Sequence, residues 1–213
     1  MIRWIKRNIF SRRAPIFCID RLRVNTDGEG VTTLVTFYRC PLNCKYCLNR
    51  KCLGKPKWYD YLSAENICRK VAIDNIYFQS TRGGVTFGGG EPLLYPRFIV
   101  EFCSCCNPAW KINIETSLNV KRSSLEMVLP FVSTFIVDIK DINSQIYRSY
   151  TGVSNNRLLE NLKYLSLKGM QGSVLIRLPL IKGFNGVEDQ NCSEEFLRSL
   201  GYTRFDRFEY VIR

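Results

Sequence analysis

The 213-residue sequence contains no histidine. Histidine is the commonest general base near neutral pH, a frequent zinc ligand and the usual partner of a catalytic serine or cysteine. Its absence therefore excludes Ser-His and Cys-His nucleophiles. No apolar run approaches the roughly 20 residues of a membrane-spanning helix, and the pair Ile9 and Phe10 is too short for a secretion signal. Chemistry performed by this chain must come largely from a cofactor.

Acidic residues are also scarce, because 19 Asp and Glu stand against 31 Lys and Arg, which gives a net charge of +12. A positive field favours an anionic partner, whether an acidic protein, a nucleic acid or a phosphorylated ligand. Ten cysteines without an export signal fit a reducing cytoplasm better than a disulfide framework. Basic residues crowd the start of the chain, which fits a solvated arm, a transit peptide or a membrane-surface contact: Arg3, Lys6, Arg7, Arg12 and Arg13.

Short apolar runs alternate with helical patterns from residue 32 onward. Strands are predicted at 32–37, 84–87, 111–115, 135–138, 174–178 and 207–211. Helices are predicted at 63–74, with Ser63 as the N-cap, and at 96–106, 123–129, 156–168 and 193–200. Six strands with right-handed crossovers predict an α/β domain over residues 27–213, either doubly wound or an incomplete barrel, after a basic arm and first segment at 1–26. In both architectures functional groups gather where the strands end.

Three cysteines, Cys40, Cys44 and Cys47, follow the first predicted strand with C-x-x-x-C-x-x-C spacing. A four-iron four-sulfur cluster held by three thiolates has one iron without a protein ligand, whereas electron-carrying clusters normally use four cysteines. That open iron can bind a small molecule. Two alternatives stay open, a four-thiolate zinc site that recruits Cys52 and inert buried cysteines. The other cysteines lack the compact spacing of a ferredoxin-like segment: Cys18, Cys68, Cys103, Cys105, Cys106 and Cys192.

The stretch RCPLNCKYCLNR resembles the cluster motif of the radical S-adenosylmethionine superfamily. The resemblance implies that the cofactor is cleaved reductively at a 4Fe-4S cluster to a 5′-deoxyadenosyl radical, which abstracts hydrogen from a substrate. It places Tyr46, just before the third cysteine, near the adenine. The stretch GVTFGGGEPLL follows the second predicted strand and resembles the element that contacts the amino group of the cofactor, here Gly89, Gly90 and Glu91.

Further stretches resemble the activating enzymes of glycyl radical enzymes, the pyruvate formate-lyase activating enzyme family. NTDGEGVTTLVTFYRC is similar to their lead-in before the first cysteine, and VDIKDINSQIYRSYTGVSNN to their D-I-K segment. The resemblance implies that Asp138, Lys140 and Arg177 contact the cofactor. Glu115 and Thr116, with Asp138, match residues that can hold a monovalent cation, although the family usually has aspartate where this chain has Glu115. Ion pairing within the protein is the alternative for all of these charged residues.

The resemblance implies a partial (β/α)6 TIM-like barrel whose lateral mouth admits a protein loop. The expected function is anaerobic formation of a glycyl radical on a partner enzyme. The alternatives are a radical peptide-modifying enzyme, either an epimerase or a cross-linking maturase, and a zinc-stabilised nucleic-acid-binding module. Nucleic acid is not favoured, because aromatic and basic residues are not interleaved on any strand.

An acidic flavodoxin or ferredoxin is the expected reductant, since the chain shows no flavin motif and no second cluster motif. No catalytic side chain is identified, because the cofactor carries the radical. The chain stops at Arg213, before the segment in which the family has a histidine near the cofactor. Either a compact variant does without that segment or another chain completes the site.

Overall fold

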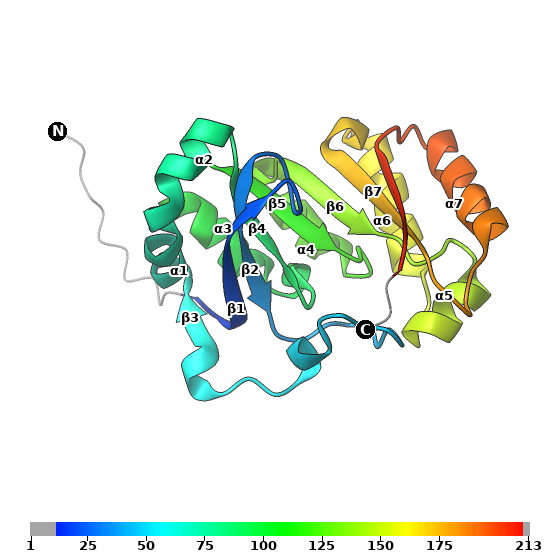
Figure 1. The fold of residues 1–213 in the computed structure, drawn as a ribbon, viewed down its shortest axis with the longest axis horizontal. Coiled ribbons are helices and arrows are strands. Elements are labelled where there is room, and N and C mark those ends of the chain that lie inside the picture. The colour runs from blue at the N-terminus through cyan, green and yellow to red at the C-terminus, as the bar shows by residue number, and fades with distance from the viewer. Residues whose placement is uncertain (1–11, 211–213) are drawn as a thin grey trace.

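Six apolar runs become six parallel strands, and the computed structural model describes residues 12–210 of the chain. The strands are β2 (Val31–Phe37), β4 (Gly84–Gly89), β5 (Lys111–Thr116), β6 (Thr134–Asp138), β7 (Val174–Leu180) and β8 (Phe205–Glu209). They lie side by side in this order, so the predicted partial barrel is confirmed (Figure 1). The last strand begins two residues before its predicted start, and Val211, at its predicted end, lies outside the described residues.

Two antiparallel strands extend the sheet, and neither is predicted from the sequence. They are β1 (Arg13–Val24), which pairs with β2, and the short β3 (Tyr61–Ser63), which pairs with β1. Most side chains of β1 are exposed and its register shifts twice, so it shows no regular alternation that could be recognised. The first segment at 13–24 therefore belongs to the sheet. Arg3, Lys6 and Arg7 of the predicted arm lie outside the described residues.

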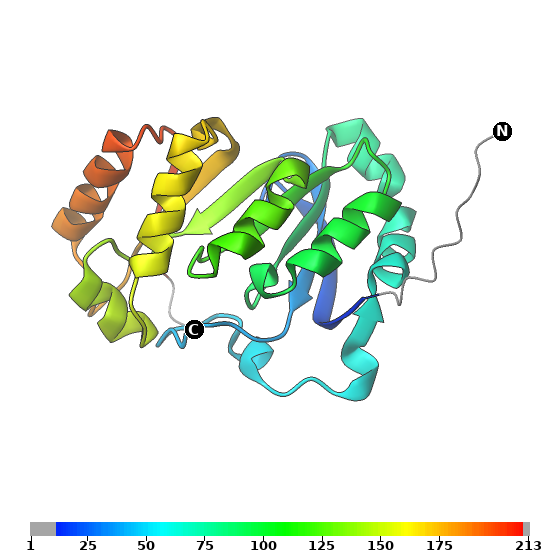
Figure 2. The same cartoon turned by 180° about the vertical axis from the view of Figure 1, so that it is seen from behind.

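Seven helices accompany the strands in the described part of the chain, and Figure 2 shows α3, α4 and α6 covering one face of the sheet. Ser63 caps the first helix as predicted, because its hydroxyl accepts from the amide of Asn66. The helices α2 and α5 are not predicted, and α7 begins six residues earlier than expected. The bounds are α1 (Ala64–Val71), α2 (Asn75–Thr81), α3 (Pro96–Cys105), α4 (Arg122–Val128), α5 (Ser144–Thr151), α6 (Asn156–Leu167) and α7 (Val187–Ser199).

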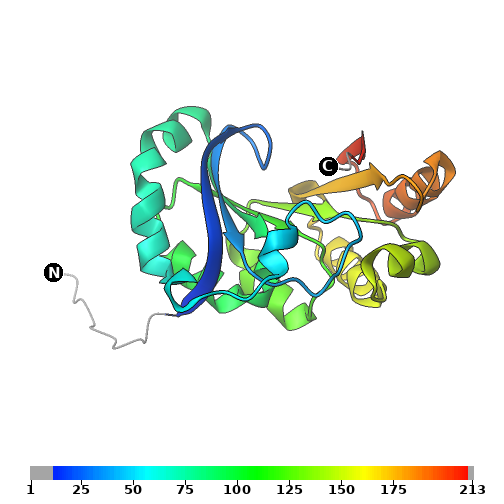
Figure 3. The same cartoon turned by 60° about the horizontal axis from the view of Figure 1, so that its bottom comes forward.

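Short 3-10 turns complete the connections: η1 (Arg50–Leu53), η2 (Trp58–Asp60), η3 (Ala72–Asp74), η4 (Pro92–Leu94), η5 (Leu129–Phe131) and η6 (Gln171–Ser173). The connection between β2 and β3 contains η1 and η2 and runs along the edge where the parallel strands end (Figures 1 and 3). Among residues 12–210, no helix combines the length and apolar character needed to cross a membrane.

The core lies between the sheet and the helices, and aromatic rings fill it near β2, β4 and α3. The ring of Phe87 lies 5.8 Å from that of Phe37 and 5.1 Å from that of Phe102, and all three side chains are fully buried. Each such side chain contributes roughly 1.5–3 kcal/mol through removal from water. Strands buried on both faces explain the continuous apolar runs of the sequence. The packed sheet forms a rigid frame for the loops at its carboxyl edge.

The loop after β5 depends on one buried side chain of α6. The Asn161 amide donates to the main-chain oxygens of Leu118, at 2.9 Å, and Val120, at 3.0 Å. Leu118 has a φ of 52°, a left-handed conformation that costs a non-glycine residue energy. Asn161 therefore holds a strained loop in place.

We expect Asn161→Ala to lower the free energy of unfolding by about 1–3 kcal/mol, because two buried carbonyls lose their donor. Urea denaturation followed by circular dichroism measures this change. Asn156→Ala on an exposed position of the same helix is the matched control and should change the free energy by less than about 0.5 kcal/mol. Equal effects of the two variants would show that Asn161 does not carry the loop.

Candidate active site

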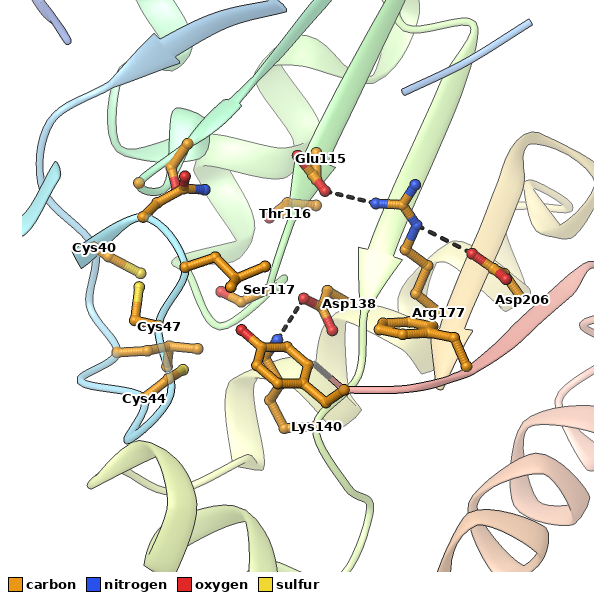
Figure 4. A pocket seen from close by; sticks show the side chains of 17 residues that line it. Cys40, Cys44, Cys47, Glu115, Thr116, Ser117, Asp138, Lys140, Arg177 and Asp206 are labelled. Carbon is orange, nitrogen blue, oxygen red and sulfur yellow. Dashed lines mark hydrogen bonds and ion pairs between the residues drawn. The ribbon is translucent and has the colours of Figure 1, made fainter. Parts of the chain in front are cut away.

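The carboxyl ends of the parallel strands surround a cavity of about 370 Å³ (Figure 4). Ten of the twelve residues expected from the sequence to form the site line this cavity. Tyr46 and Glu91 are the two that do not. The ten are Cys40, Cys44, Cys47, Gly89, Gly90, Glu115, Thr116, Asp138, Lys140 and Arg177.

The three cysteines lie on the loop that follows β2, and Figure 4 shows their sulfur atoms directed toward a common space. Main-chain hydrogen bonds fasten this loop to α5, from the amide of Asn43 to the oxygen of Thr151 at 2.9 Å and from Lys45 to Tyr150 at 3.0 Å. Arg50 donates to the oxygen of Cys44 at 3.3 Å. The loop is thus held by backbone contacts, which leave the thiols free to bind a ligand.

The thiols of Cys40 and Cys44 are buried and protonated when no metal is bound. Burial raises the pKa of Cys40 to about 12 and that of Cys44 to about 11. No three Cys, Asp or Glu side chains within residues 12–210 stand close enough to hold a single metal ion. In an iron-sulfur cluster each thiolate binds a different iron, so the sulfur atoms stand further apart than around one ion. The donor set fits a cluster better than zinc, and Cys52, buried beyond the loop, does not line the cavity.

The glycine run at the end of β4 packs against the end of β2. Gly89 has a φ of 89°, and a Cβ added there would lie 2.4 Å from the Cβ of Thr36. A Cβ added to Gly90 would lie 2.2 Å from the main-chain oxygen of Arg39. Only glycine fits at both positions. The run therefore brings bare main chain to the wall of the cavity beside the cysteine loop.

Glu91 lies behind that wall and is completely buried. Its carboxylate accepts from the hydroxyl of Thr116 at 2.8 Å and from the hydroxyl and amide of Ser117 at 2.7 and 3.0 Å. Burial raises the pKa of Glu91, and these hydrogen bonds oppose that rise. Through these hydrogen bonds, Glu91 joins the ends of β4 and β5. Its expected contact with a cofactor stays a prediction.

Asp138 and Lys140 form an ion pair in the middle of the cavity (Figure 4). Burial acts to lower the pKa of Lys140, but Asp138 and Cys44 outweigh it and raise that pKa, so the side chain stays an ammonium ion. The second carboxylate oxygen of Asp138 is buried without a hydrogen-bond partner. Because buried acceptors are normally satisfied, this oxygen marks a place where a ligand can donate.

Arg177 bridges several segments at the other side of the cavity. Its guanidinium donates to Glu115 at 2.7 Å and to the main-chain oxygen of Thr26 at 2.6 Å, and it lies 3.4 Å from Asp206 (Figure 4). Burial raises the pKa of Glu115, and Arg177 opposes that rise. The ion-pair alternative therefore holds for Arg177 and Glu115, although both side chains also face the cavity.

Seven further residues line the cavity but are not predicted as site residues: Leu42, Leu48, Asn49, Ser117, Asp206, Phe208 and Tyr210. The Tyr210 hydroxyl donates to the main-chain oxygen of Tyr46 at 2.6 Å and so fastens the end of β8 to the cysteine loop. The Tyr46 ring packs against Tyr150 and Phe184. Asp206, Phe208 and Tyr210 recur at period two, a signal that could have identified one face of the last strand.

Known proteins resemble this chain over most of its length. Residues 34–191 match the family model of the Radical SAM superfamily. The (2S)-3-sulfopropanediol dehydratase activating enzyme of Klebsiella oxytoca is 31% identical over 87% of this chain and 78% of the relative. The pyruvate formate-lyase 1-activating enzyme of Escherichia coli K12 is 29% identical over 82% of this chain and 72% of the relative.

Solved structures share the fold at low identity. Streptococcus suis SuiB bound to S-adenosylmethionine superposes with a TM-score of 0.63 at 20% identity, over 84% of this chain and 40% of that chain. The coproporphyrinogen III oxidase HemN of Escherichia coli has a TM-score of 0.54 at 15% identity, over 86% of this chain and 45% of that chain. Given the matched model, the relatives and the three-cysteine loop, the chain belongs to the radical SAM superfamily, enzymes that use a four-iron four-sulfur cluster and S-adenosylmethionine.

Proposed function

We propose that this protein activates a partner enzyme by forming a glycyl radical on it, with the cluster held by Cys40, Cys44 and Cys47. One observation carries the proposal: these three thiols line the same cavity as Asp138 and Lys140, at the carboxyl edge of the sheet. The relatives that cover most of the chain are activating enzymes by name, of sulfopropanediol dehydratase, choline trimethylamine-lyase and pyruvate formate-lyase.

The residues around the cavity fit S-adenosylmethionine. Lys140 can pair with the carboxylate or ribose of the cofactor, and the unpartnered oxygen of Asp138 can accept from it. Bare main chain at Gly89 and Gly90 can approach its amino group. A cluster held by Cys40, Cys44 and Cys47 would supply the reductive cleavage of S-adenosylmethionine that is needed to remove hydrogen from the substrate glycine.

A monovalent cation beside the cofactor would compete with contacts inside the protein. One carboxylate oxygen of Glu115 accepts from the guanidinium of Arg177, and the Thr116 hydroxyl donates to Glu91 and accepts from the amide of Leu118. A cation would therefore have to share these groups. The contacts of the described residues support an ion pair at Glu115 more directly.

The relatives are named as activating enzymes of other enzymes, which favours a protein substrate over a short peptide. The likeness to SuiB does not bear on the substrate, because at 20% identity it reports the fold alone. A partner loop can reach the cavity past Leu48, which is 65% exposed at its rim. The reductant that we propose is an acidic flavodoxin or ferredoxin, in an anaerobic cytoplasm.

The decisive experiment combines the reconstituted protein with dithionite, S-adenosylmethionine and a candidate glycyl radical enzyme encoded nearby. We expect the doublet of a glycyl radical in the electron paramagnetic resonance spectrum, formed together with 5′-deoxyadenosine. The matched control is the same partner with its acceptor glycine replaced by alanine, which should give no doublet. Modification of a short precursor peptide instead of radical formation would favour the peptide-modifying alternative.

Cys44→Ala should abolish cleavage of S-adenosylmethionine, because two remaining thiolates cannot hold the cluster. Iron content and the amount of 5′-deoxyadenosine after incubation with dithionite measure this loss. Cys192→Ala changes an exposed cysteine that does not line the cavity and should leave both values unchanged. If Cys44→Ala still produced 5′-deoxyadenosine, the ligand assignment would be wrong.

Lys140→Met should raise the KM for S-adenosylmethionine by about tenfold or more, because a charge-assisted contact is lost. Iron content should not change, since Lys140 is not a ligand. The double variant Lys140→Met with Asp138→Asn avoids leaving a buried carboxylate unpaired and guards against misfolding. Lys182→Met, at an exposed position, is the control. An unchanged KM in both Lys140 variants would remove this residue from the cofactor site.

A further inference from the structure

The segment of residues 50–60, here called the basic ledge, leads from the cysteine loop to β3 and includes η1 and η2. It runs along the edge where the strands end (Figure 3). None of its residues lines the cavity, whose lining from this part of the chain stops at Asn49. The amide of Arg39 donates to the oxygen of Cys52 at 2.8 Å. The basic ledge is therefore attached to the residue that precedes Cys40, outside the cavity.

Positive charge dominates the basic ledge. It carries Arg50, Lys51, Lys55 and Lys57 against one acid, Asp60. That acid is used within the ledge, because its carboxylate accepts from the amide of Lys57 at 2.7 Å. Lys51 and Lys55 are exposed, and neither forms an ion pair with any other residue in the 12–210 range. The ledge thus offers uncompensated ammonium groups to solvent.

Two aromatic side chains stand among these charges. Trp58 is 84% exposed and Tyr59 is 53% exposed, and their rings pack edge to face with centroids 5.7 Å apart. The ammonium of Lys57 lies 5.5 Å from the centroid of the Tyr59 ring, a cation–π contact that sets a positive charge directly beside this exposed pair. Exposed tryptophan and tyrosine beside basic residues are the side chains that most often carry the energy of a protein interface.

We propose that the basic ledge is the docking surface for an acidic one-electron donor protein. This inference depends on the proposed function only in placing a cluster at Cys40, Cys44 and Cys47. The partner is expected to be acidic, because acidic proteins are steered to an uncompensated basic surface. The partner is expected to donate an electron, because the ledge adjoins the cysteine loop from outside the cavity. One electron leaves the donor and enters the cluster, and no bond forms or breaks in that transfer.

The substrate protein requires a different surface. Its reacting atom has to enter the cavity, whose lining includes Leu48 and residues of β7 and β8. Electron transfer has no such requirement, because the donor needs only proximity to the loop. Donor and substrate can therefore bind at the same time, the donor on the basic ledge and the substrate at the cavity, which no residue of the ledge lines.

The test is the rate at which a negatively charged bacterial flavodoxin, in its hydroquinone form, reduces the cluster of the reconstituted protein in stopped-flow absorbance. Lys51→Glu combined with Lys55→Glu should slow this reduction about tenfold at low ionic strength, and added salt should shrink the difference. Reduction by methyl viologen, a small cation that needs no docking surface, should not slow. Trp58→Ala should raise the Kd for flavodoxin about tenfold, measured by surface plasmon resonance.

The matched control is Lys111→Glu combined with Lys163→Glu, which makes the same change in net charge at exposed positions away from the ledge. It should alter flavodoxin reduction by less than about twofold. Equal slowing by both double variants would overturn the proposal, because net charge alone would then explain the rate. Slowing with methyl viologen would also overturn it, since the cluster itself would be damaged.

The remaining outcomes separate this proposal from the proposed function. If the ledge variants left flavodoxin reduction unchanged but raised the KM for the protein substrate, the ledge would be a substrate surface and the proposal would be wrong. The proposal would also be wrong if single-stranded RNA bound the wild-type protein but not the Trp58→Ala variant, while flavodoxin did not compete for that binding. A ledge-dependent reduction in a protein that forms no glycyl radical would uphold it while the proposed function failed.

Discussion

Parallel pairing of the strands is the constraint on which the site depends. In the register, Phe37 lies opposite Gly89 and Asp138 lies opposite Arg177, so the six parallel strands all end at the same edge. A loop that leaves β2 at this edge must meet the glycine run of β4 and the charged ends of β5 to β7. The main-chain hydrogen bonds between the strands therefore bring together functional side chains that are distant in sequence. Helices on the outer face keep this edge rigid.

Buried charge is the second constraint, because an unpaired ion in a protein interior is costly. Lys140 is paired with Asp138, Glu115 with Arg177, and Glu91 is surrounded by hydrogen-bond donors. This pairing leaves a single carboxylate oxygen of Asp138 unsatisfied beside the cysteine loop. A site built in this way is ready for a polar cofactor, since the charges are in place before it binds.

The cysteine loop has two accessible sides with different character. Toward the barrel it faces a cavity lined by charged and aromatic side chains, and away from the barrel it continues into the basic ledge. In our proposals this division has a purpose, because the substrate reacts on the cavity side and the electron arrives on the side of the basic ledge. The hydrogen bond from Tyr210 to Tyr46 holds the end of β8 to the same loop.

The sequence by itself determined the spacing of the three cysteines, the six apolar strands and the glycine run, because these depend on neighbouring residues and on short periods. Only the tertiary structure decided that Glu91 lies behind the wall, that β1 joins the sheet and that Tyr210 reaches the site. Those facts depend on contacts between separate segments, 25 residues apart for Glu91 with Thr116 and 164 residues apart for Tyr210 with Tyr46. Local patterns carry no information on such pairings, since register and packing between distant segments direct each side chain.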